Sequence, residues 1–250
     1  MDSRRSGRYS GKPESKLILI GVQARTDSTR LPGKVNLEIA GKTVLEHVMD
    51  SCDQASSYLN RNFNRYQCIV RVNCLIPNAD PLMIRYGNKY PIQSFPGVED
   101  DDVLSRYVQA ADESRADYVI RITADCVFTA PYLISRCAKA ALISKHDYVS
   151  NVQIRTFREG MDVEVISAPL LEWLNETAKS KEDREHVTTL LRNRKLVPRK
   201  FRFCHVLNDV DDSYIKTSID TQDDLNRAIA EFDSLNSKRR QALSNGDTVS

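Results

Sequence analysis

Three cations lie close together near the start of the chain, directly after a short apolar run. The stretch from Gln23 to Lys34 reads QARTDSTRLPGK and follows LILIGV. Its cations are Arg25, Arg30 and Lys34, and the Pro-Gly pair before Lys34 favours a turn that exposes backbone N–H groups. Guanidinium and ammonium groups both bind phosphate oxygens. The stretch therefore predicts a phosphate site, with ordinary solvated surface charge as the competing interpretation.

The spacing of this stretch differs from two common phosphate-binding loops. It lacks the GxxxxGK[ST] spacing of a P-loop and the GxGxxG spacing of a dinucleotide-binding turn. A triphosphate is the anion that three cations match best. We therefore predict a nucleotide triphosphate site of another type.

Two aspartates come directly after predicted strands. Asp125 lies in RITADC and Asp220 lies in SIDTQDDL. Mg²⁺ commonly takes one or two carboxylates together with phosphate oxygens, so this pair predicts a magnesium site. The alternatives are a turn aspartate for Asp125 and the N-cap of the last helix for Asp220.

Such residues meet only if the chain brings several strand ends to one edge of a sheet. Apolar runs alternate with amphipathic ones in the order βαβα through the first 150 residues, which predicts a parallel sheet covered by helices on both faces. Later strands are expected to be mixed in direction. The expected strands are 17–24, 67–76, 92–95, 118–123, 147–151, 162–166, 201–207 and 214–219. The expected helices are 43–59, 79–90, 101–116, 131–145, 169–178, 183–193 and one from 222.

Composition fits one globular α/β domain. The chain has 250 residues, of which 41% are hydrophobic and 28% charged, and its net charge is +2. That charge is too small to predict nucleic-acid binding or membrane binding by bulk electrostatics. Six cysteines without a CxxC pair predict reduced thiols in a cytoplasmic protein and no zinc site.

Both ends of the chain differ in composition from the region between them. Residues 1–15 carry several cations and almost no apolar side chains, which predicts a disordered basic arm. Residues 236–250 predict a flexible C-terminal tail. A single domain is expected over 16–235.

Several motifs together resemble the cytidylyltransferases that activate acidic sugars. The resemblance is greatest to the spore-coat polysaccharide (SpsF-like) branch, which is related to the enzymes that make CMP-sialic acid and CMP-ketodeoxyoctulosonate. It covers Leu17 to Leu225, and it departs from the family at Val127, where Pro is usual, and loosely over 67–97. The matching motifs are QARTDSTRLPGK, AGKTVLEHV, VEDDDVLSRYVQAA, DYVIRITADC, DYVSN, REGMDVEVIS, REHVT and IDTQDDL.

The resemblance implies a fold and a set of site residues. The fold is a three-layer α/β/α nucleotide-diphospho-sugar transferase-like domain with a mostly parallel mixed sheet. Related enzymes hold Mg²⁺ with the two aspartates that correspond to Asp125 and Asp220, so the resemblance implies these two as the metal ligands. The implied catalytic cations are Arg25, Arg30 and Lys34. The implied nucleotide-binding residues are Gln23, Ala24, Arg25, Ser28, Arg30, Lys34, Arg121 and Asp125. The implied acceptor-binding residues are Asp162, Glu164 and His186.

Other interpretations of some of these residues stay open. Asp162 and Glu164 equally fit a buried structural carboxylate pair, and Arg121 fits the exposed face of its strand. His47, on a predicted helix face, is expected to be structural.

The implied reaction is transfer of CMP from CTP to an acidic sugar of the 3-deoxy-2-ulosonic acid type, with release of pyrophosphate, for glycan biosynthesis. The resemblance also implies a homodimer, no nucleic-acid partner and no membrane insertion. Two alternatives remain. A glycosyltransferase on a similar sheet would use a DxD motif, and DVD is present at Asp209–Asp211. A non-catalytic relative would keep the fold and lose the site.

Overall fold

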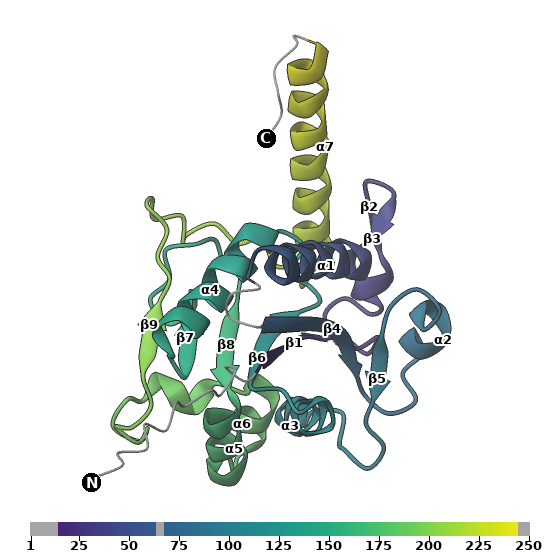
Figure 1. The fold of residues 1–250 in the computed structure, drawn as a ribbon. Helices are drawn as coiled ribbons and strands as arrows, with labels where there is room; N and C mark the ends of the chain where they lie inside the picture. Colours follow the sequence, from purple (N-terminus) through teal and green to yellow (C-terminus); the bar gives the residue numbers. More distant parts are fainter. Residues whose placement is uncertain (1–14, 64–67, 245–250) are drawn as a thin grey trace, which may run out of the picture.

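One sheet organises the structure, a computed structural model that describes residues 15–63 and 68–244 (Figure 1). The seven strands of this sheet within the described residues run in the order β5-β4-β1-β6-β8-β7-β9. Strand β8 is antiparallel to β6 and β7, whereas the other pairs are parallel. The predicted fold class, α/β with a mostly parallel mixed sheet, is confirmed. The strands are β1 (Lys16–Gln23), β4 (Cys68–Ile76), β5 (Ile92–Ser94), β6 (Tyr118–Thr123), β7 (Tyr148–Ser150), β8 (Glu164–Ser167) and β9 (Phe203–His205), and β2 (Glu38–Ile39) pairs separately with β3 (Lys42–Thr43).

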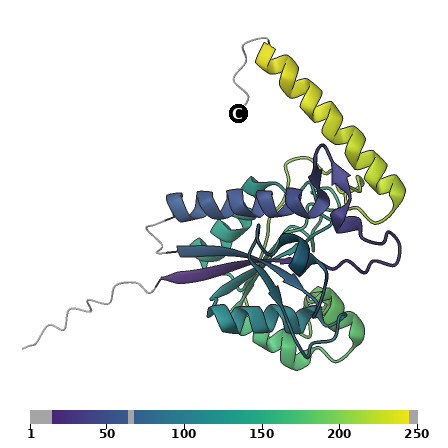
Figure 2. The same ribbon diagram turned by 90° about the vertical axis from the view of Figure 1, so that its right-hand side faces the viewer.

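Helices cover both faces of the sheet and complete three layers (Figure 2). One face carries α1 (Val44–Asn62) and α4 (Pro131–Ser144), which share one hydrophobic core with alternate residues of β1 and β6. The other face carries α3 (Val103–Ser114), α5 (Ala168–Thr177) and α6 (Lys181–His186). Helix α1 begins with a capping box in which Thr43 and Glu46 satisfy each other's backbone N–H groups. The short helix α2 (Leu82–Tyr86) precedes β5.

The face under α3 changes from apolar to polar along β1 and β6. Leu19 of β1 and Val119 of β6 are fully buried there, and they pair in register. Side chains alternate along a strand, so the next positions on this face are Gly21 opposite Arg121, and then Gln23 opposite Thr123. This row of polar side chains, at the carboxyl ends of both strands, is where a ligand site is expected in an open α/β sheet.

A glycine in that row admits a tyrosine ring. A Cβ atom at Gly21 would lie 2.6 Å from Cε1 of Tyr107 on α3. The Tyr107 hydroxyl donates to the Gly21 carbonyl at 2.9 Å and to the Ile122 carbonyl at 3.3 Å. The ring therefore ties α3 to the centre of the sheet.

Two predicted elements are wrong. The segment 214–219 forms no strand and makes only an isolated bridge between Glu159 and Lys216. Its backbone is used instead to reach the end of β6, because Ile219 N donates to the Asp125 carbonyl at 3.1 Å. The predicted strand 201–207 is the shorter β9, and it pairs with β7.

The predicted helix 183–193 is interrupted. It ends as α6 at His186, and Val187 follows with a positive φ of 61°, which a β-branched residue rarely adopts. A separate 3-10 helix, η3, spans Thr189–Arg192. Apolar periodicity cannot detect such a reversal, because Val187 and Leu191 are both buried as helix residues would be.

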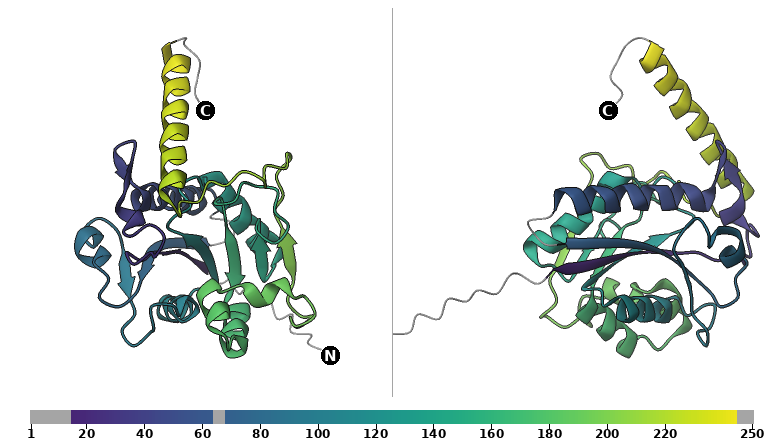
Figure 3. Two further views of the ribbon diagram at one scale, coloured as in Figure 1. Left: turned by 180° about the vertical axis from the view of Figure 1, so that it is seen from behind. Right: turned by 45° about the vertical axis from the view of Figure 1, so that its right-hand side comes forward.

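The last helix, expected from residue 222 with no stated end, continues to Ser244 and so runs into the predicted tail of 236–250. Helix α7 (Gln222–Ser244) stands away from the body beyond its first turns (Figure 3). Phe232 keeps its first half in contact with the body, with ring centroids 4.6 Å from His47 and 5.0 Å from Phe128. Residues 1–14 of the predicted arm and 245–250 of the predicted tail lie outside the described residues, and the domain boundaries stay predictions. None of the described helices combines the length and apolarity needed to cross a membrane.

Candidate active site

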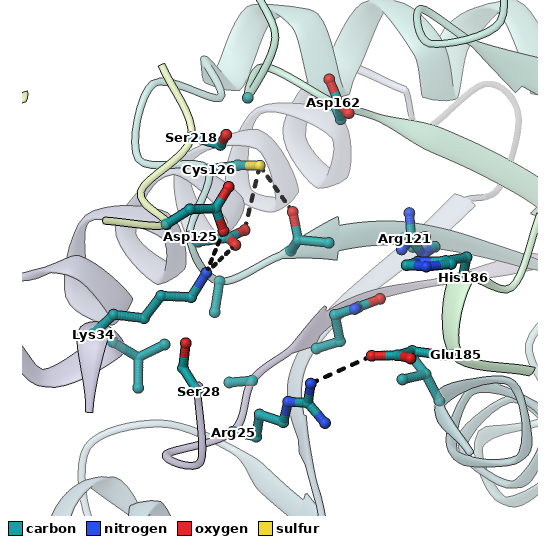
Figure 4. A pocket seen from close by; sticks show the side chains of 18 of the residues that line it. Arg25, Ser28, Lys34, Arg121, Asp125, Cys126, Asp162, Glu185, His186 and Ser218 are labelled. Carbon is teal, nitrogen blue, oxygen red and sulfur yellow. Dashed lines mark hydrogen bonds and ion pairs between the residues drawn. The ribbon is translucent and has the colours of Figure 1, made fainter. Parts of the chain in front are cut away.

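A pocket of about 320 Å³ lies at the carboxyl ends of β1 and β6 (Figure 4). The loop after β1 and the short helix η1 (Lys34–Asn36) form one wall, and the segments around α6 and before α7 contribute others. Nearly every residue predicted for the site lines this pocket. They are Gln23, Ala24, Arg25, Ser28, Arg30, Lys34, Arg121, Asp125, Asp162, His186 and Asp220.

One end of the pocket, which we call the lysine end, consists of Lys34, Asp125 and Asp220. Lys34 Nζ lies 2.5 Å from Asp125 Oδ2, 3.0 Å from Asp220 Oδ1 and 2.8 Å from the Ile219 carbonyl oxygen. An ammonium group has three donors, so Lys34 is fully satisfied here. Burial lowers the pKa of Lys34, but attraction and hydrogen bonds from the two aspartates outweigh burial and raise it above its usual value.

Asp220 is the more heavily paired carboxylate of the two. It also accepts from Arg30 at 2.7 Å and lies 3.1 Å from Lys216 Nζ. Burial raises the pKa of Asp220, and the bonds from Lys34 and Lys216 reverse that effect and lower it. Asp220 is not the N-cap of α7, because Thr221 directly precedes Gln222 and its hydroxyl accepts from the Asp224 backbone N–H at 3.2 Å.

The wall beside the lysine end is built by close backbone contact. Gly160 has φ of 98°, and a Cβ atom there would lie 2.8 Å from Ser218 Cα. Cys126 also lines the pocket, and burial raises the pKa of its thiol well above the usual value. A thiol that stays protonated is a poor nucleophile, which agrees with chemistry that needs no covalent intermediate.

A second group of polar residues that line the pocket, which we call the arginine end, consists of Gln23, Arg106 and Arg121. Figure 4 draws Arg121 and His186 well apart from Lys34 and Asp125. Arg121 Nη1 lies 2.7 Å from Glu164 Oε2, its partner across β6 and β8. Burial lowers the pKa of Arg121, but Glu164 outweighs burial and raises it.

Arg25 lies between the two ends. Its guanidinium pairs with Asp101 at 2.7 Å and with Glu185 at 3.3 Å. The Arg25–Glu185 bond links the loop after β1 to α6 across the pocket (Figure 4).

The two carboxylates predicted to bind the acceptor differ in whether they line the pocket. Asp162 lines the pocket and is held by Arg155 in a bidentate pair at 2.6 and 3.0 Å. Glu164 does not line it: the residue is 2% exposed, pairs with Arg121 and accepts from the Tyr148 hydroxyl. The prediction of Glu164 as an acceptor-binding residue is therefore corrected, because its carboxylate is already bound by Arg121 and Tyr148 inside the sheet.

Sequence reasoning missed Arg106, Glu185, Gly160 and Ser218. Arg106 left a signal, because it lies three residues after Val103 and four before Ala110, on the buried face of α3. An arginine in that phase interrupts an apolar stripe. The other three left no signal, because their positions depend on contacts between distant segments.

The DVD motif lies outside the pocket. Asp209 and Asp211 are absent from its lining, and the Asp211 carboxylate accepts from the Ser213 backbone N–H. His47 is also outside, with Nε2 2.7 Å from the Ile39 carbonyl oxygen, as expected of a structural histidine.

The two aspartates fit a divalent cation in one respect. They hold an ammonium group between them, which marks the point where their negative potential converges. Among the described residues, no group of three or more His, Cys, Asp or Glu side chains could hold a metal. Mg²⁺ accepts one or two carboxylates when phosphate oxygens and waters complete its shell, so the pair fits a metal that enters with a polyphosphate.

A mixed α/β sheet with a cationic loop and two paired carboxylates in a pocket beyond its strand ends suits the binding of a nucleotide triphosphate with its metal. Residues 19–246 match the model of the cytidylyltransferase family, and the chain belongs to that family.

Two curated relatives match. The uncharacterized protein MJ1063 of Methanocaldococcus jannaschii is 31% identical over 171 residues, which are 68% of this chain. The match spans 65% of that protein, slightly under two thirds of its length. The spore coat polysaccharide biosynthesis protein SpsF of Bacillus subtilis is 27% identical over 210 residues, covering 83% of this chain and 82% of that protein.

Solved structures share the fold. A cytidylyltransferase from Leptospira borgpetersenii has a TM-score of 0.68 and 28% identity, with 85% of this chain and 84% of that chain covered. A CMP:2-keto-3-deoxy-manno-octonic acid synthetase complexed with CTP has a TM-score of 0.60 and 14% identity, with 88% and 99% covered. At that identity, the second match shows the fold alone.

Proposed function

We propose that this protein transfers CMP from CTP to an acidic sugar and releases pyrophosphate. The single observation that carries the proposal is that the cations of the loop after β1 meet Asp125 and Asp220 in one pocket. These segments are distant in sequence, and a cationic loop beside paired carboxylates suits a polyphosphate with its metal. Family membership favours CTP among the nucleotides.

In the proposed reaction, an acceptor oxygen attacks the α-phosphorus of CTP in line. The new P–O bond forms as the bond to the β-phosphate breaks, and pyrophosphate leaves. Such a transition state places charge on phosphoryl oxygens, so positioning and electrostatic stabilisation supply most of the catalysis. Arg25, Arg30 and Lys34 would stabilise the leaving pyrophosphate.

Lys34 must change partners in this scheme. Its ammonium holds both aspartates at 2.5 and 3.0 Å, and it would turn toward the phosphates when they enter. Asp125 and Asp220 would then hold Mg²⁺. When bound, the metal would supply charge neutralisation at the phosphates and a lower pKa for the attacking hydroxyl.

The direct test is pyrophosphate release from CTP, Mg²⁺ and a panel of acidic sugars, with ATP, GTP and UTP as controls. We expect release with CTP and at least one acidic sugar, and little with the other nucleotides. Hydrolysis of a nucleotide-sugar without turnover of CTP would favour a glycosyltransferase instead. Binding of CTP without turnover of any acceptor would favour a non-catalytic relative.

A homodimer and a cytoplasmic location also remain proposals. The homodimer rests on the resemblance alone, and light scattering on the purified chain would test it. The cytoplasmic location is supported by the six cysteines, all of which are free thiols.

A further inference from the structure

Arg106 is a buried cation without a carboxylate partner. It is 2% exposed, yet it lines the pocket. Its Nη1 donates to the Asp100 carbonyl at 2.9 Å, and its Nε is buried with no acceptor among the described residues. No ion pair to Arg106 forms within those residues, whereas the nearby Arg25 and Arg184 each pair with a carboxylate.

Most carboxylates near Arg106 pair with other cations, whereas that of Asp100 attracts Arg106 without forming an ion pair with it. Asp102 pairs with Arg184 at 2.7 Å, and Asp101 and Glu185 pair with Arg25. Burial lowers the pKa of Arg106, and repulsion from Arg25 contributes to the same shift. Burying a cation without a partner costs several kcal/mol, so a ligand that compensates it is the simplest reason for its place here.

The other two residues of the arginine end also carry buried polar atoms without hydrogen-bond partners in the part of the chain that the structure describes. Arg121 Nε and Gln23 Oε1 are buried without hydrogen-bond partners among the described residues. Both side chains lie on the polar row of the sheet beneath α3. Buried polar atoms are normally paired, so three such atoms on one pocket wall point to a polar ligand.

The chemistry of this end favours a carboxylate over a phosphate. Arg121 is paired with Glu164, whereas Arg106 has no ion pair among the described residues, and a ligand carboxylate would supply one. Guanidinium groups bind planar carboxylates through parallel hydrogen bonds. The phosphates of CTP already have Arg25, Arg30 and Lys34.

We propose that Arg106, supported by Arg121, binds the carboxylate of the acceptor and thereby selects acidic acceptors. This inference rests on the proposed function. It makes Arg106 a specificity-determining residue that is distinct from those of the lysine end.

The test uses pyruvate, a small 2-oxo carboxylate, as the probe on the full chain. The Arg106 Nε–H resonance is assigned by its loss in Arg106→Gln. We expect pyruvate to shift the Nε–H resonances of Arg106 and Arg121 saturably, and uncharged methyl pyruvate to leave them unchanged. In Arg106→Gln, the pyruvate Kd read from Arg121 should rise about 30-fold, as expected for a lost charge-assisted bond.

The same proteins are titrated with CTP and pyrophosphate by calorimetry. CTP should bind Arg106→Gln within about 2-fold of wild type if the two ligand sites are separate. Arg71→Gln, on an exposed position of β4, is the matched control and should leave both affinities unchanged. The inference is overturned if pyrophosphate shifts the Arg106 resonance and pyruvate does not, if CTP affinity falls 30-fold, or if pyruvate affinity is unaffected. Failure of wild type to bind CTP would instead refute the proposed function and leave the pyruvate result to be read separately.

Discussion

The two ends of the pocket treat charge in opposite ways. At the lysine end, Lys34 is surrounded by two carboxylates and a carbonyl, and all its donors are used. At the arginine end, Arg106 has one carbonyl acceptor and no carboxylate. A site whose charged groups are already paired must exchange partners to bind a ligand, whereas a cation without an ion pair gains a missing partner. The first arrangement suits a metal–polyphosphate complex, and the second suits a simple anion.

Removing a carboxylate from the lysine end should have the largest effect. We expect Asp125→Asn to lower pyrophosphate release from CTP about 1000-fold, because electrostatic groups at a reacting phosphoryl centre contribute effects of that size. Asp209→Asn, outside the pocket, should keep wild-type activity and serves as the control. Wild-type turnover by Asp125→Asn would remove that residue from the catalytic site.

The arginine end can be divided by comparing its two arginines. Arg121→Gln leaves Glu164 buried without its cation, and we expect a loss of about 3 kcal/mol in the free energy of unfolding. Arg106→Gln removes an unpaired cation and should lose no stability. Urea denaturation of both variants measures the difference. Equal losses would show that Arg106 is a structural residue like Arg121.

Arg30 separates activity from folding at the lysine end. Its side chain is 64% exposed, so its pair with Asp220 should add less than about 0.5 kcal/mol to stability. We expect Arg30→Ala to lower kcat/KM for CTP roughly 30-fold, the cost of one charge-assisted hydrogen bond. Unchanged turnover at limiting CTP would contradict a role in phosphate binding, and an unchanged urea midpoint is the folding control.

The smallest expected effect is a pH dependence at Asp220. Its pKa is lowered in the folded protein, so its charge stabilises the fold above the usual value of 3.8, and that contribution is lost as the pH falls below it. Asp220→Asn should therefore lose about 1.5 kcal/mol at pH 7, and the difference from wild type should shrink below pH 3.8. Denaturation curves at several pH values test this. A difference that stays constant into acid would mean that Asp220 is not stabilised as a carboxylate.

Sequence reasoning found the lysine end more completely than the arginine end. Arg25 and Asp125 lie just beyond strand ends, which a parallel sheet places together, and Lys34 belongs to the loop that follows the first strand, so local pattern was enough. The arginine end depends on a helix laid across the sheet. That packing is not encoded at any one position, and Arg106 was visible only as an interruption of an apolar stripe.

The errors in the fold have the same physical origin. Segment 214–219 has the alternation of a strand, but its backbone bonds go to Glu159 and Asp125. The reversal at Val187 depends on the surroundings that hold an unfavourable φ. Glu164 was given to the acceptor because the family resemblance implied it, whereas its register opposite Arg121 buries it.

The polar row on β1 and β6 also limits how the site can vary. Binding positions and core positions alternate along both strands, so inserting or deleting one residue before Gly21 would exchange Gln23 with a core position such as Val22. On the proposed assignment, acceptor choice would be changed by point substitution at Arg121 and Arg106, while the loop from 26 to 33 can also change in length. The sheet therefore fixes which residues lie at the bottom of the pocket, and the loop forms its entrance.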